Sequence, residues 1–244
     1  MDIGNSRIKW SCQSADGLGE PQAAVYTKAN AGACLDERWK ELNKPEQIWV
    51  ANVAGKTVAD QLQRWTLSRW GIAPRFAEVT ESAGGVRNAY AEISQLGVDR
   101  WLALIAAWRK YGSAACIVGC GTAVTIDGLD GAGRHLGGLI LPGVAMMQQS
   151  LYQTASGIPA AAEVTFKRGL ADNTGQGVLT GCTMAVVSLI DRVVDELMNT
   201  TGSKLVCVIT GGGAGEILPL LQARFTYAPL LVLEGLAFIA GDKP

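Results

Sequence analysis

A strand, a glycine turn and a second strand occur twice in this sequence, once at its beginning and once near its middle. Residues 2–10 (DIGNSRIKW) align with residues 119–127 (GCGTAVTID), which places Gly4 on Gly121. The shared stretch is short, but its second copy stands where a second domain would begin. The pattern therefore predicts a chain whose second half repeats the opening of its first half.

Hydrophobic periodicity predicts mixed α/β structure along the whole chain. The clearest helix spans residues 98–111, where Trp101, Leu104, Ile105 and Trp108 recur at the spacing of one helical face. Further helices are expected at residues 31–43, 57–70, 143–154 and 175–199. Another helix should follow the GGGAG turn and end at Leu221, and a last helix should close the chain. Strands are expected at residues 3–12, 23–28, 47–53, after Pro74, and at 114–118, 123–129, 136–141, 204–210 and 230–233, with a polar loop at 80–97.

The predicted domain boundary lies near residue 112. It separates an N-terminal domain of residues 1–112 from a C-terminal domain of residues 113–244, and the last helix is expected to pack back on the first domain. A chain of 244 residues buries roughly 70 to 75% of its unfolded surface. Two small cores that share a cleft are therefore possible.

Composition excludes several classes of function. A formal net charge of −1 and a pI near 5.9 argue against nucleic acid or an acidic membrane as the main partner. The single histidine, His135, excludes a zinc site built on two or three histidines. A Ser-His-Asp catalytic triad would have to use that same histidine. In a turn before a strand, His135 is more often structural than catalytic.

The cysteines and the apolar segments indicate a cytoplasmic protein. The six cysteines form no CxxC pair, so we expect reduced, mostly buried thiols. No apolar run approaches the roughly 18 residues of a membrane span, and the N-terminus lacks the pattern of a signal peptide.

The opening turn combines residue types that suit a phosphate and a metal ion. Gly4 lets backbone N–H groups approach a phosphate, Asn5 and Ser6 offer small polar side chains, and Asp2 can hold Mg²⁺ through water. The alternative interpretation is an ordinary β-hairpin with Asn5 and Ser6 at its tip. Two further glycine turns, at 121–122 and 211–213, would support the phosphate interpretation if they converged with the first.

A second candidate site is Gly97-Val98-Asp99-Arg100, at the start of the predicted helix 98–111. Asp99 can accept a hydroxyl proton and Arg100 can form a forked contact with a carboxylate. Asp99 can equally be an ordinary acid in the first turn of a helix. Thr174, taken alone, is an ordinary helix start.

Five segments together resemble type III pantothenate kinases: DIGNSRIK at 2–9, GVDR at 97–100, GTAVT at 121–125, GGLILPG at 137–143 and TGGG at 210–213. The resemblance extends over nearly the whole chain. It implies the α/β fold of the acetate and sugar kinase, heat-shock ATPase and actin superfamily, with two ribonuclease-H-like domains and an ATP cleft between them.

The resemblance also implies a reaction, the transfer of the ATP γ-phosphoryl group to pantothenate in the first step of coenzyme A synthesis. Asp99 matches the general base. The first phosphate loop matches Asp2, Ile3, Gly4, Asn5, Ser6, Arg7, Ile8 and Lys9, with Mg²⁺ near Asp2, and Thr122 matches a nucleotide contact. The pantothenate-binding positions match Tyr90, Gly97, Val98, Asp99, Arg100 and Thr174.

The same resemblance implies a cytoplasmic homodimer whose pantothenate pocket lies at the subunit interface. Two features depart from the family. Relatives carry Asp at the position of Gly119, where it coordinates K⁺ or NH₄⁺, so we expect such an ion to bind more weakly, to bind differently or not to be required. Relatives also have several strand residues before the aspartate that matches Asp2, so the first strand is unusually short or the chain begins late.

Two other functions stay open from the sequence. The first is a kinase-like regulator related to the Bvg accessory factors, which Gly119 favours and Asp99, Arg100, Lys9 and Thr174 oppose. The second is another kinase or phosphatase of the superfamily that acts on a sugar or polyphosphate, which the GVDR motif opposes.

Overall fold

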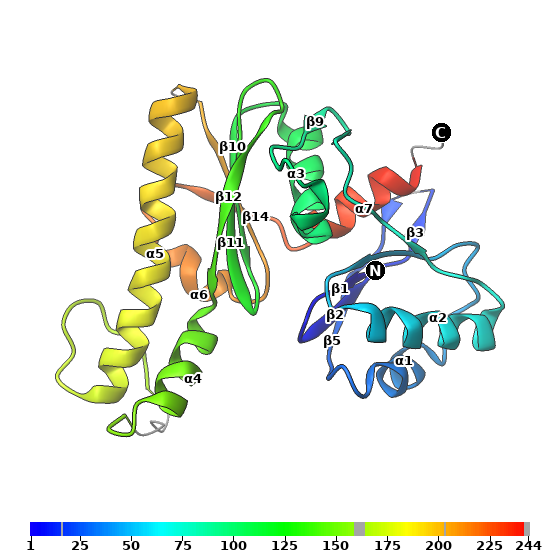
Figure 1. The fold of residues 1–244 in the computed structure, drawn as a ribbon, viewed down its shortest axis with the longest axis horizontal. Helices are drawn as coiled ribbons and strands as arrows, with labels where there is room; N and C mark the ends of the chain where they lie inside the picture. Colours follow the sequence, from blue (N-terminus) through cyan, green and yellow to red (C-terminus); the bar gives the residue numbers. More distant parts are fainter. Residues whose placement is uncertain (16, 159–163, 203, 242–244) are drawn as a thin grey trace. The chain divides into compact units, whose positions relative to one another are not determined.

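The computed structural model describes residues 1–15, 17–158, 164–202 and 204–241. The chain divides into two compact units. The first unit comprises Met1–Tyr111 together with the segment that begins at Leu230, and the second comprises Gly112–Pro229. The closing helix therefore belongs with the first unit, and Figure 1 shows the elements of each unit.

A five-stranded sheet forms the centre of the first unit, in the order β5-β2-β1-β6-β7. β1 runs antiparallel to β2 and parallel to β6. The strands are β1 (Asp2–Ile3), β2 (Arg7–Trp10), β5 (Gln22–Val25), β6 (Trp49–Asn52) and β7 (Arg75–Phe76); two small hairpins are β3 (Gln13–Ser14) with β4 (Gly17–Leu18) and β8 (Ser82–Ala83) with β9 (Val86–Arg87).

Helices cover both faces of this sheet. They are α1 (Ala31–Trp39), α2 (Lys56–Trp70), α3 (Val98–Tyr111) and α7 (Leu231–Gly241), with a 3₁₀ turn η1 (Ile93–Gln95). Residues of α1 and α2 pack on one face with Ile3 and Val50, and residues of α3 and α7 pack on the other with Ala51. Because successive strand residues point to opposite faces, Asp2 shares the α3 and α7 face with Ala51.

Tryptophans dominate the core between the sheet and α1 and α2. The ring of Trp39 stacks on Trp70 with centroids 5.7 Å apart, and it meets Trp10 and Trp65 edge to face at 5.9 and 5.6 Å. Edge-to-face and offset stacks are the favoured arrangements of aromatic rings. This cluster holds the start of the first unit's chain, including β2, against α1 and α2.

The second unit repeats the sheet of the first with five strands in the order β12-β11-β10-β13-β14. In both units the first strand in sequence lies at the centre, the second and third follow antiparallel on one side, and the fourth and fifth follow parallel on the other. The predicted repeat is therefore present in the fold. Its strands are β10 (Ala115–Cys120), β11 (Ala123–Leu129), β12 (His135–Pro142), β13 (Val206–Thr210) and β14 (Phe225–Tyr227).

The longest helix of the second unit packs on its sheet. The helices are α4 (Val144–Thr154), α5 (Thr174–Thr201) and α6 (Ala214–Ile217), followed by a 3₁₀ turn η2 (Leu218–Leu220). By length and hydropathy, α5 alone among the described helices is able to cross a membrane, so the expectation that no segment is so apolar is wrong. Its apolar side chains Val186, Val187, Ile190 and Val194 are buried beside Cys116 and Val118 of β10, as in the core helix of a globular domain.

Three predicted elements differ from the structure. The strand expected at 3–12 is two strands, because the chain turns at Gly4–Ser6. The loop expected at 80–97 contains the β8–β9 hairpin and η1. The strand expected at 230–233 is wrong: these residues belong to the loop and first turn of α7, whose buried Leu231 and Leu233 form a helical rather than a strand contact, and the strand lies earlier, at β14.

Candidate active site

The turn between β1 and β2 is a tight hairpin that presents polar residues to solvent. The Gly4 N–H donates to the Arg7 carbonyl at 3.0 Å, and Asn5 and Ser6 form the exposed tip. The hydroxyl of Tyr26 donates to the Gly4 carbonyl at 2.7 Å, and its backbone N–H donates to the Ser6 carbonyl at 3.3 Å. The turn is thus the hairpin of the alternative interpretation, and it is braced in a shape that leaves its tip open to a ligand.

Not every residue of the predicted phosphate loop can touch a ligand directly. Ile3 and Ile8 are each 1% exposed and lie in the core of the first unit, so their side chains anchor the hairpin. Lys9 lies opposite Asp2 across the ladder and shares its face of the sheet. Asp2 and Lys9 are therefore the charged side chains at the base of the hairpin.

Asp2 lies in an unusual electrostatic environment. Burial raises its pKa from 3.8 to about 6, and the carboxylate of Asp99 adds to the rise. Lys9 and the Met1 amine act in the opposite direction. Two carboxylates that repel each other are a natural place for a divalent cation, whose charge would favour the ionised form of both.

The GVDR segment places Asp99 and Arg100 in the first turn of α3. The Arg100 N–H donates to Asp99 Oδ1 at 2.8 Å. A Cβ on Gly97 would lie 2.6 Å from Asp99 Oδ1, so a glycine is needed for the carboxylate to take this position. Val98 is buried and fastens the turn to the core with Leu102.

Arg100 is a buried cation held by an aromatic ring. It is 6% exposed, its Nη1 donates to the Tyr90 hydroxyl at 3.1 Å, and its guanidinium carbon lies 5.7 Å from the centre of the Tyr90 ring. The Asn88 side chain in turn accepts the Tyr90 N–H at 2.9 Å. A preoriented guanidinium of this kind suits a carboxylate or phosphate ligand.

Two of the three predicted glycine turns meet in the second unit. Thr122 lies in the turn between β10 and β11, where the Gly121 N–H donates to the Ala123 carbonyl at 3.0 Å. Gly211 has φ +100°, and a Cβ on it would lie 2.2 Å from the Cys120 carbonyl oxygen. The two turns pack directly on each other at Cys120, and the third turn belongs to the first unit.

Thr174 and Gly119 are also residues of the second unit. Thr174 is the first residue of α5, whose preceding Asn173 side chain accepts the Gln176 N–H at 3.0 Å. A Cβ on Gly119 would lie 2.7 Å from the Thr125 hydroxyl across the ladder. The predicted site residues thus fall into two groups, one in each unit.

The residues present fit a magnesium ion that keeps most of its waters. Among the described residues, no group of three or more His, Cys, Asp or Glu could enclose a metal ion. Asp2 supplies a hard carboxylate oxygen, whose pKa is raised first by burial and then by the carboxylate of Asp99. Mg²⁺ binds through one or two carboxylates, water and substrate phosphates, which matches this set.

His135 and the cysteines do not form a reactive centre. The His135 Nε2 lies 3.0 Å from Asp127 Oδ1, and both side chains are buried between β11 and β12. All six cysteines are free thiols. Burial raises the pKa of Cys120 to about 12 and that of Cys207 to about 11, which keeps these thiols protonated and unreactive.

Sequence reasoning missed Tyr26 and Asn88. Both act through other residues, Tyr26 on the Gly4 turn and Asn88 on Tyr90. Tyr26 follows β5, which lies beside β2, so its proximity to Gly4 follows from sheet order. Asn88 lies in the stretch that was predicted to be a loop.

A family model described as type III pantothenate kinase matches residues 1–196. The chain belongs to the type III pantothenate kinase family. A type III pantothenate kinase from Nitrosococcus oceani is 41% identical over 247 residues, covering 99% of this chain and 93% of the relative. Another from an Azoarcus species is 36% identical, covering 98% of this chain and 89% of the relative.

Solved structures show the same fold at lower identity. A Baf-family protein from Campylobacter jejuni has a TM-score of 0.60 and 20% identity, covering 97% of this type III pantothenate kinase family member and 94% of that chain. The activator of 2-hydroxyisocaproyl-CoA dehydratase from Clostridium difficile has a TM-score of 0.51 and 12% identity, covering 98% and 92%. These likenesses confirm the predicted α/β fold, with its two five-stranded sheets.

Proposed function

We propose that this protein transfers the γ-phosphoryl group of ATP to the primary hydroxyl of pantothenate, giving 4′-phosphopantothenate in the first step of coenzyme A synthesis. The observation that carries this proposal is the arrangement of Asp99 and Arg100 in the first turn of α3. Arg100 donates a hydrogen bond to the Tyr90 hydroxyl, and Asp99 lies close enough to Asp2 to affect its pKa. Membership of the kinase family gives the reaction class.

Phosphoryl transfer requires mainly that the protein align the two substrates and neutralise the charge of the phosphates. Asp99 accepts the proton of the pantothenate hydroxyl as it attacks the γ-phosphorus. Asp2 holds Mg²⁺ through water, and the ion offsets the negative charge of the phosphates. The backbone and polar side chains of Gly4, Asn5 and Ser6, with Arg7 and Lys9, orient the phosphate chain.

Pantothenate carries a carboxylate, and Arg100 is the cation proposed to bind it. Tyr90 and Asn88 hold the guanidinium in place before the substrate arrives, which reduces the entropy lost on binding. Gly97 and Val98 shape the turn, and Thr174 supplies a further pantothenate contact from the second unit.

The second unit is proposed to complete the nucleotide site. Apart from the closing segment that begins at Leu230, which belongs with the first unit, the two units correspond to the proposed ribonuclease-H-like domains of residues 1–112 and 113–244. Thr122 would contact the nucleotide phosphates. The packing of the Gly211 turn on Cys120, next to Gly121 and Thr122, supports this assignment because it brings two glycine turns together at one strand end.

A monovalent cation, K⁺ or NH₄⁺, is proposed to bind more weakly here than where the family carries aspartate. Gly119 supplies no carboxylate, and the nearest side-chain atom to a Cβ built there is the neutral Thr125 hydroxyl. One hard oxygen ligand and one negative charge are thereby lost.

The functional protein is proposed to be a cytoplasmic homodimer. Leu139 and Ile140 on the edge strand β12 are 45% and 64% exposed, and Met146 and Leu151 on α4 are also exposed. An apolar edge strand beside an apolar helix is a surface that a second copy can cover. The near-neutral charge gives no support for nucleic acid or membrane as a partner.

A coupled assay of ATP-dependent pantothenate phosphorylation with Mg²⁺, run with K⁺, NH₄⁺ or Na⁺, tests the function. We expect turnover that depends on pantothenate and responds only weakly to the choice of cation. Absence of turnover in every salt, in protein shown to be folded, would instead support the regulator that Gly119 favours, a kinase-like protein of the Bvg accessory factor type.

A further inference from the structure

The β8–β9 hairpin of the first unit is fastened to the C-terminal half of α3. Its two-residue turn, Gly84-Gly85, has positive φ at both positions, +59° and +87°, as a tight hairpin requires. A Cβ on Gly84 would lie 2.7 Å from the Ile105 side chain, and one on Gly85 would lie 2.6 Å from the Trp108 indole nitrogen. The hairpin therefore packs tightly on the same helix whose first turn carries Arg100.

The ladder of this hairpin sets the direction of the Asn88 side chain. β8 and β9 pair Ala83 with Val86, and the Asn88 N–H extends the ladder by donating to the Glu81 carbonyl at 2.9 Å. Val86 is 1% exposed, whereas Arg87 is exposed. Because strand residues alternate between two faces, Asn88 lies on the buried face together with Val86.

A hydrogen bond to the backbone distinguishes the two ends of the Asn88 amide. The Tyr90 N–H donates to one end at 2.9 Å, and only the oxygen of a side-chain amide accepts such a bond. The other end is therefore the NH₂ group, which carries two donors. Its nitrogen is buried and has no acceptor among the residues that the structure describes. Because an unmet buried donor costs stability, this NH₂ group needs a partner that a ligand can supply.

The contacts of Asn88 lead directly to the proposed pantothenate site. Asn88 holds the backbone of Tyr90, and the Tyr90 hydroxyl accepts from the Arg100 guanidinium at 3.1 Å. The three residues thus form one connected set of hydrogen bonds. A ligand that satisfies the Asn88 NH₂ must offer an acceptor, and the carboxylate proposed to bind at Arg100 offers two oxygens that each accept more than one hydrogen bond.

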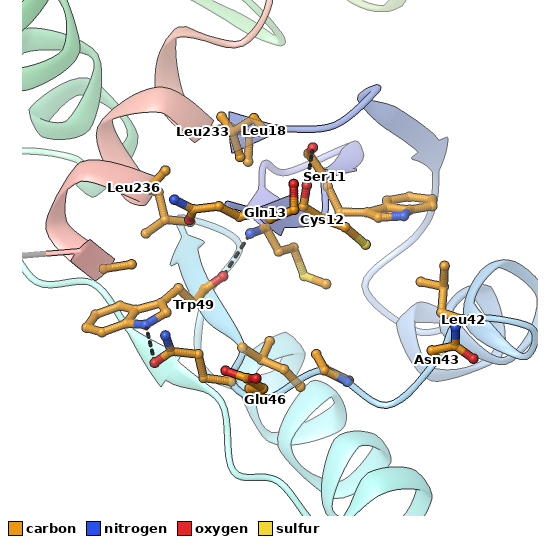
Figure 2. A pocket seen from close by; sticks show the side chains of 18 of the residues that line it. Ser11, Cys12, Gln13, Leu18, Leu42, Asn43, Glu46, Trp49, Leu233 and Leu236 are labelled. Atoms are coloured by element: carbon orange, nitrogen blue, oxygen red, sulfur yellow. Dashed lines mark hydrogen bonds between the residues drawn. The ribbon is translucent and has the colours of Figure 1, made fainter. Parts of the chain in front are cut away.

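A cavity elsewhere in the first unit does not explain the Asn88 amide. It has a volume of about 760 Å³, and Figure 2 shows Gln13 and Leu236 among the residues that line it. None of Asn88, Tyr90 and Arg100 lines this cavity. A ligand held there would not meet the Asn88 NH₂ group, which leaves the Arg100 site as the source of its acceptor.

We propose that Asn88 is a substrate-binding residue that determines specificity, and that its side-chain NH₂ donates a hydrogen bond to the carboxylate of pantothenate beside Arg100. This role rests on the proposed function. The oxygen of the amide holds Tyr90 while its nitrogen binds the substrate, so one side chain has two tasks. A substrate with a neutral alcohol in place of the carboxylate would offer this NH₂ group a poorer acceptor and lose the charge that Arg100 attracts.

Three variants separate the two tasks of Asn88. Asn88→Ser and Asn88→Asp keep an oxygen that accepts the Tyr90 N–H but lack the NH₂ donors, whereas Asn88→Ala loses both. We expect Asn88→Ser to bind pantothenate about tenfold more weakly than the parent, with KM for ATP unchanged. Asn88→Asp should bind it more weakly still, because its charge repels the carboxylate. Isothermal titration of the full chain gives the affinities, and the coupled assay gives KM and kcat.

A substrate analogue tests the assignment to the carboxylate. Pantothenol carries a hydroxymethyl group in place of the carboxylate and keeps the hydroxyl that is phosphorylated. We expect the parent to prefer pantothenate in kcat/KM, and Asn88→Ser to narrow this preference about tenfold, because the variant loses a contact that only pantothenate makes fully. If Asn88→Ser weakened both substrates equally, the contact would not be to the carboxylate and the proposal would be overturned.

Two controls make similar changes away from the NH₂ group. Ala89→Ser alters the exposed residue between Asn88 and Tyr90, and Gln13→Ser removes a side-chain amide at the cavity in Figure 2. Both should keep the parent's affinity and preference for pantothenate. Parent values in Asn88→Ser and Asn88→Asp, with a loss only in Asn88→Ala, would reduce Asn88 to a support for Tyr90 and overturn the proposal.

Failure of the proposed function would give a different result. Folded parent protein would then neither bind nor phosphorylate pantothenate, whatever residue stands at position 88. Binding and turnover by the parent, combined with unchanged constants in Asn88→Ser, would instead contradict only the role assigned to the Asn88 NH₂ group.

Discussion

The two units carry the same sheet and differ at the end of its first strand. In the first unit that strand carries Asp2, whose carboxylate has a pKa that burial and Asp99 raise. In the second unit the matching position is Gly119, and its neighbour across the ladder is a threonine. The same topology thus supports a charged strand end, where we propose Mg²⁺ to bind, in one copy and a neutral strand end, packed on glycines, in the other.

The turns that follow these two strands also differ, in the groups that hold each turn in place. The first unit closes its turn with the Gly4–Arg7 hydrogen bond and braces it with the Tyr26 hydroxyl. The second unit closes a tighter turn with the Gly121–Ala123 bond and braces it with the backbone of the Gly211 turn. The Tyr26 side chain thus stabilises the first turn, and the Gly211 turn stabilises the second.

The largest effect is expected at Asp99 in the first unit, the carboxylate that we propose as the general base. Asp99→Asn removes the base and should lower kcat by about 10²-fold or more, with ATP binding nearly intact. Steady-state kinetics and nucleotide titration measure the two quantities. An unchanged kcat would show that Asp99 is not the general base. The first unit would then no longer differ from the second by carrying that base.

Asp2→Asn makes the first unit resemble the second at this strand end. We expect roughly a tenfold loss of kcat/KM for MgATP, since one metal ligand is lost. The metal-free variant should nevertheless be more stable, by about 2 to 4 °C in Tm, corresponding to ~1 kcal/mol, because it removes a carboxylate that is disfavoured by burial and by repulsion from Asp99.

The pH dependence of stability checks this interpretation of Asp2. The folded pKa of about 6 lies above the ordinary 3.8, so the folded protein holds the proton more tightly than the unfolded chain. The contribution of Asp2 to stability is thus greatest below about pH 4 and is lost as the pH rises through 6. Denaturation of the parent and of Asp2→Asn at several pH values should differ mainly in this window, whereas equal slopes would contradict the raised pKa.

Gly119→Asp makes the opposite change, giving the second unit a carboxylate. We expect activation by K⁺ or NH₄⁺ over Na⁺ to rise several-fold, measured in the coupled assay. Because a Cβ at 119 comes within 2.7 Å of the Thr125 hydroxyl, the double variant Gly119→Asp/Thr125→Ala, which lacks that hydroxyl, controls for crowding. Equal indifference to these ions in parent and variants would mean that position 119 is not an ion site.

The smallest effect is expected from the brace of the first turn. Tyr26→Phe removes one hydrogen bond to the Gly4 carbonyl, worth about 1 kcal/mol. KM for ATP should rise about two- to fivefold, with kcat nearly unchanged, because Tyr26 positions the turn and touches no reacting atom. A fall in kcat at constant KM would argue against this role.

Local patterns predicted most of the fold and the segments that carry the site. The repeated strand and turn became two sheets of identical order, and the helix predicted at 98–111 is α3. The strand predicted at 230–233 was wrong because a short apolar run is compatible with both a strand and a buried helical turn. Packing against α3 makes this segment helical. At Gly235 the approach is so close that a Cβ would lie 2.1 Å from the Leu102 carbonyl oxygen.

The supporting contacts of the site could not be predicted in this way. Tyr90 and Arg100 lie on opposite sides of η1, and the contact between them depends on the fold of the 80–97 segment. In that segment, Gly85 at φ +87° packs against the indole of Trp108, a contact between residues more than twenty positions apart. Such contacts arise from tertiary packing, which leaves no periodic signal in the sequence.

The tryptophan cluster has a spectroscopic consequence. All seven tryptophans lie between Trp10 and Trp108, and so within the first unit, while Gly112–Pro229 contains none. Selectively excited indole emission therefore reports on the first unit alone, whereas far-ultraviolet ellipticity reports on both, with a large share from the 28-residue α5. Comparing the two signals during unfolding would resolve whether the duplicated halves melt together or one after the other, with no label added to either.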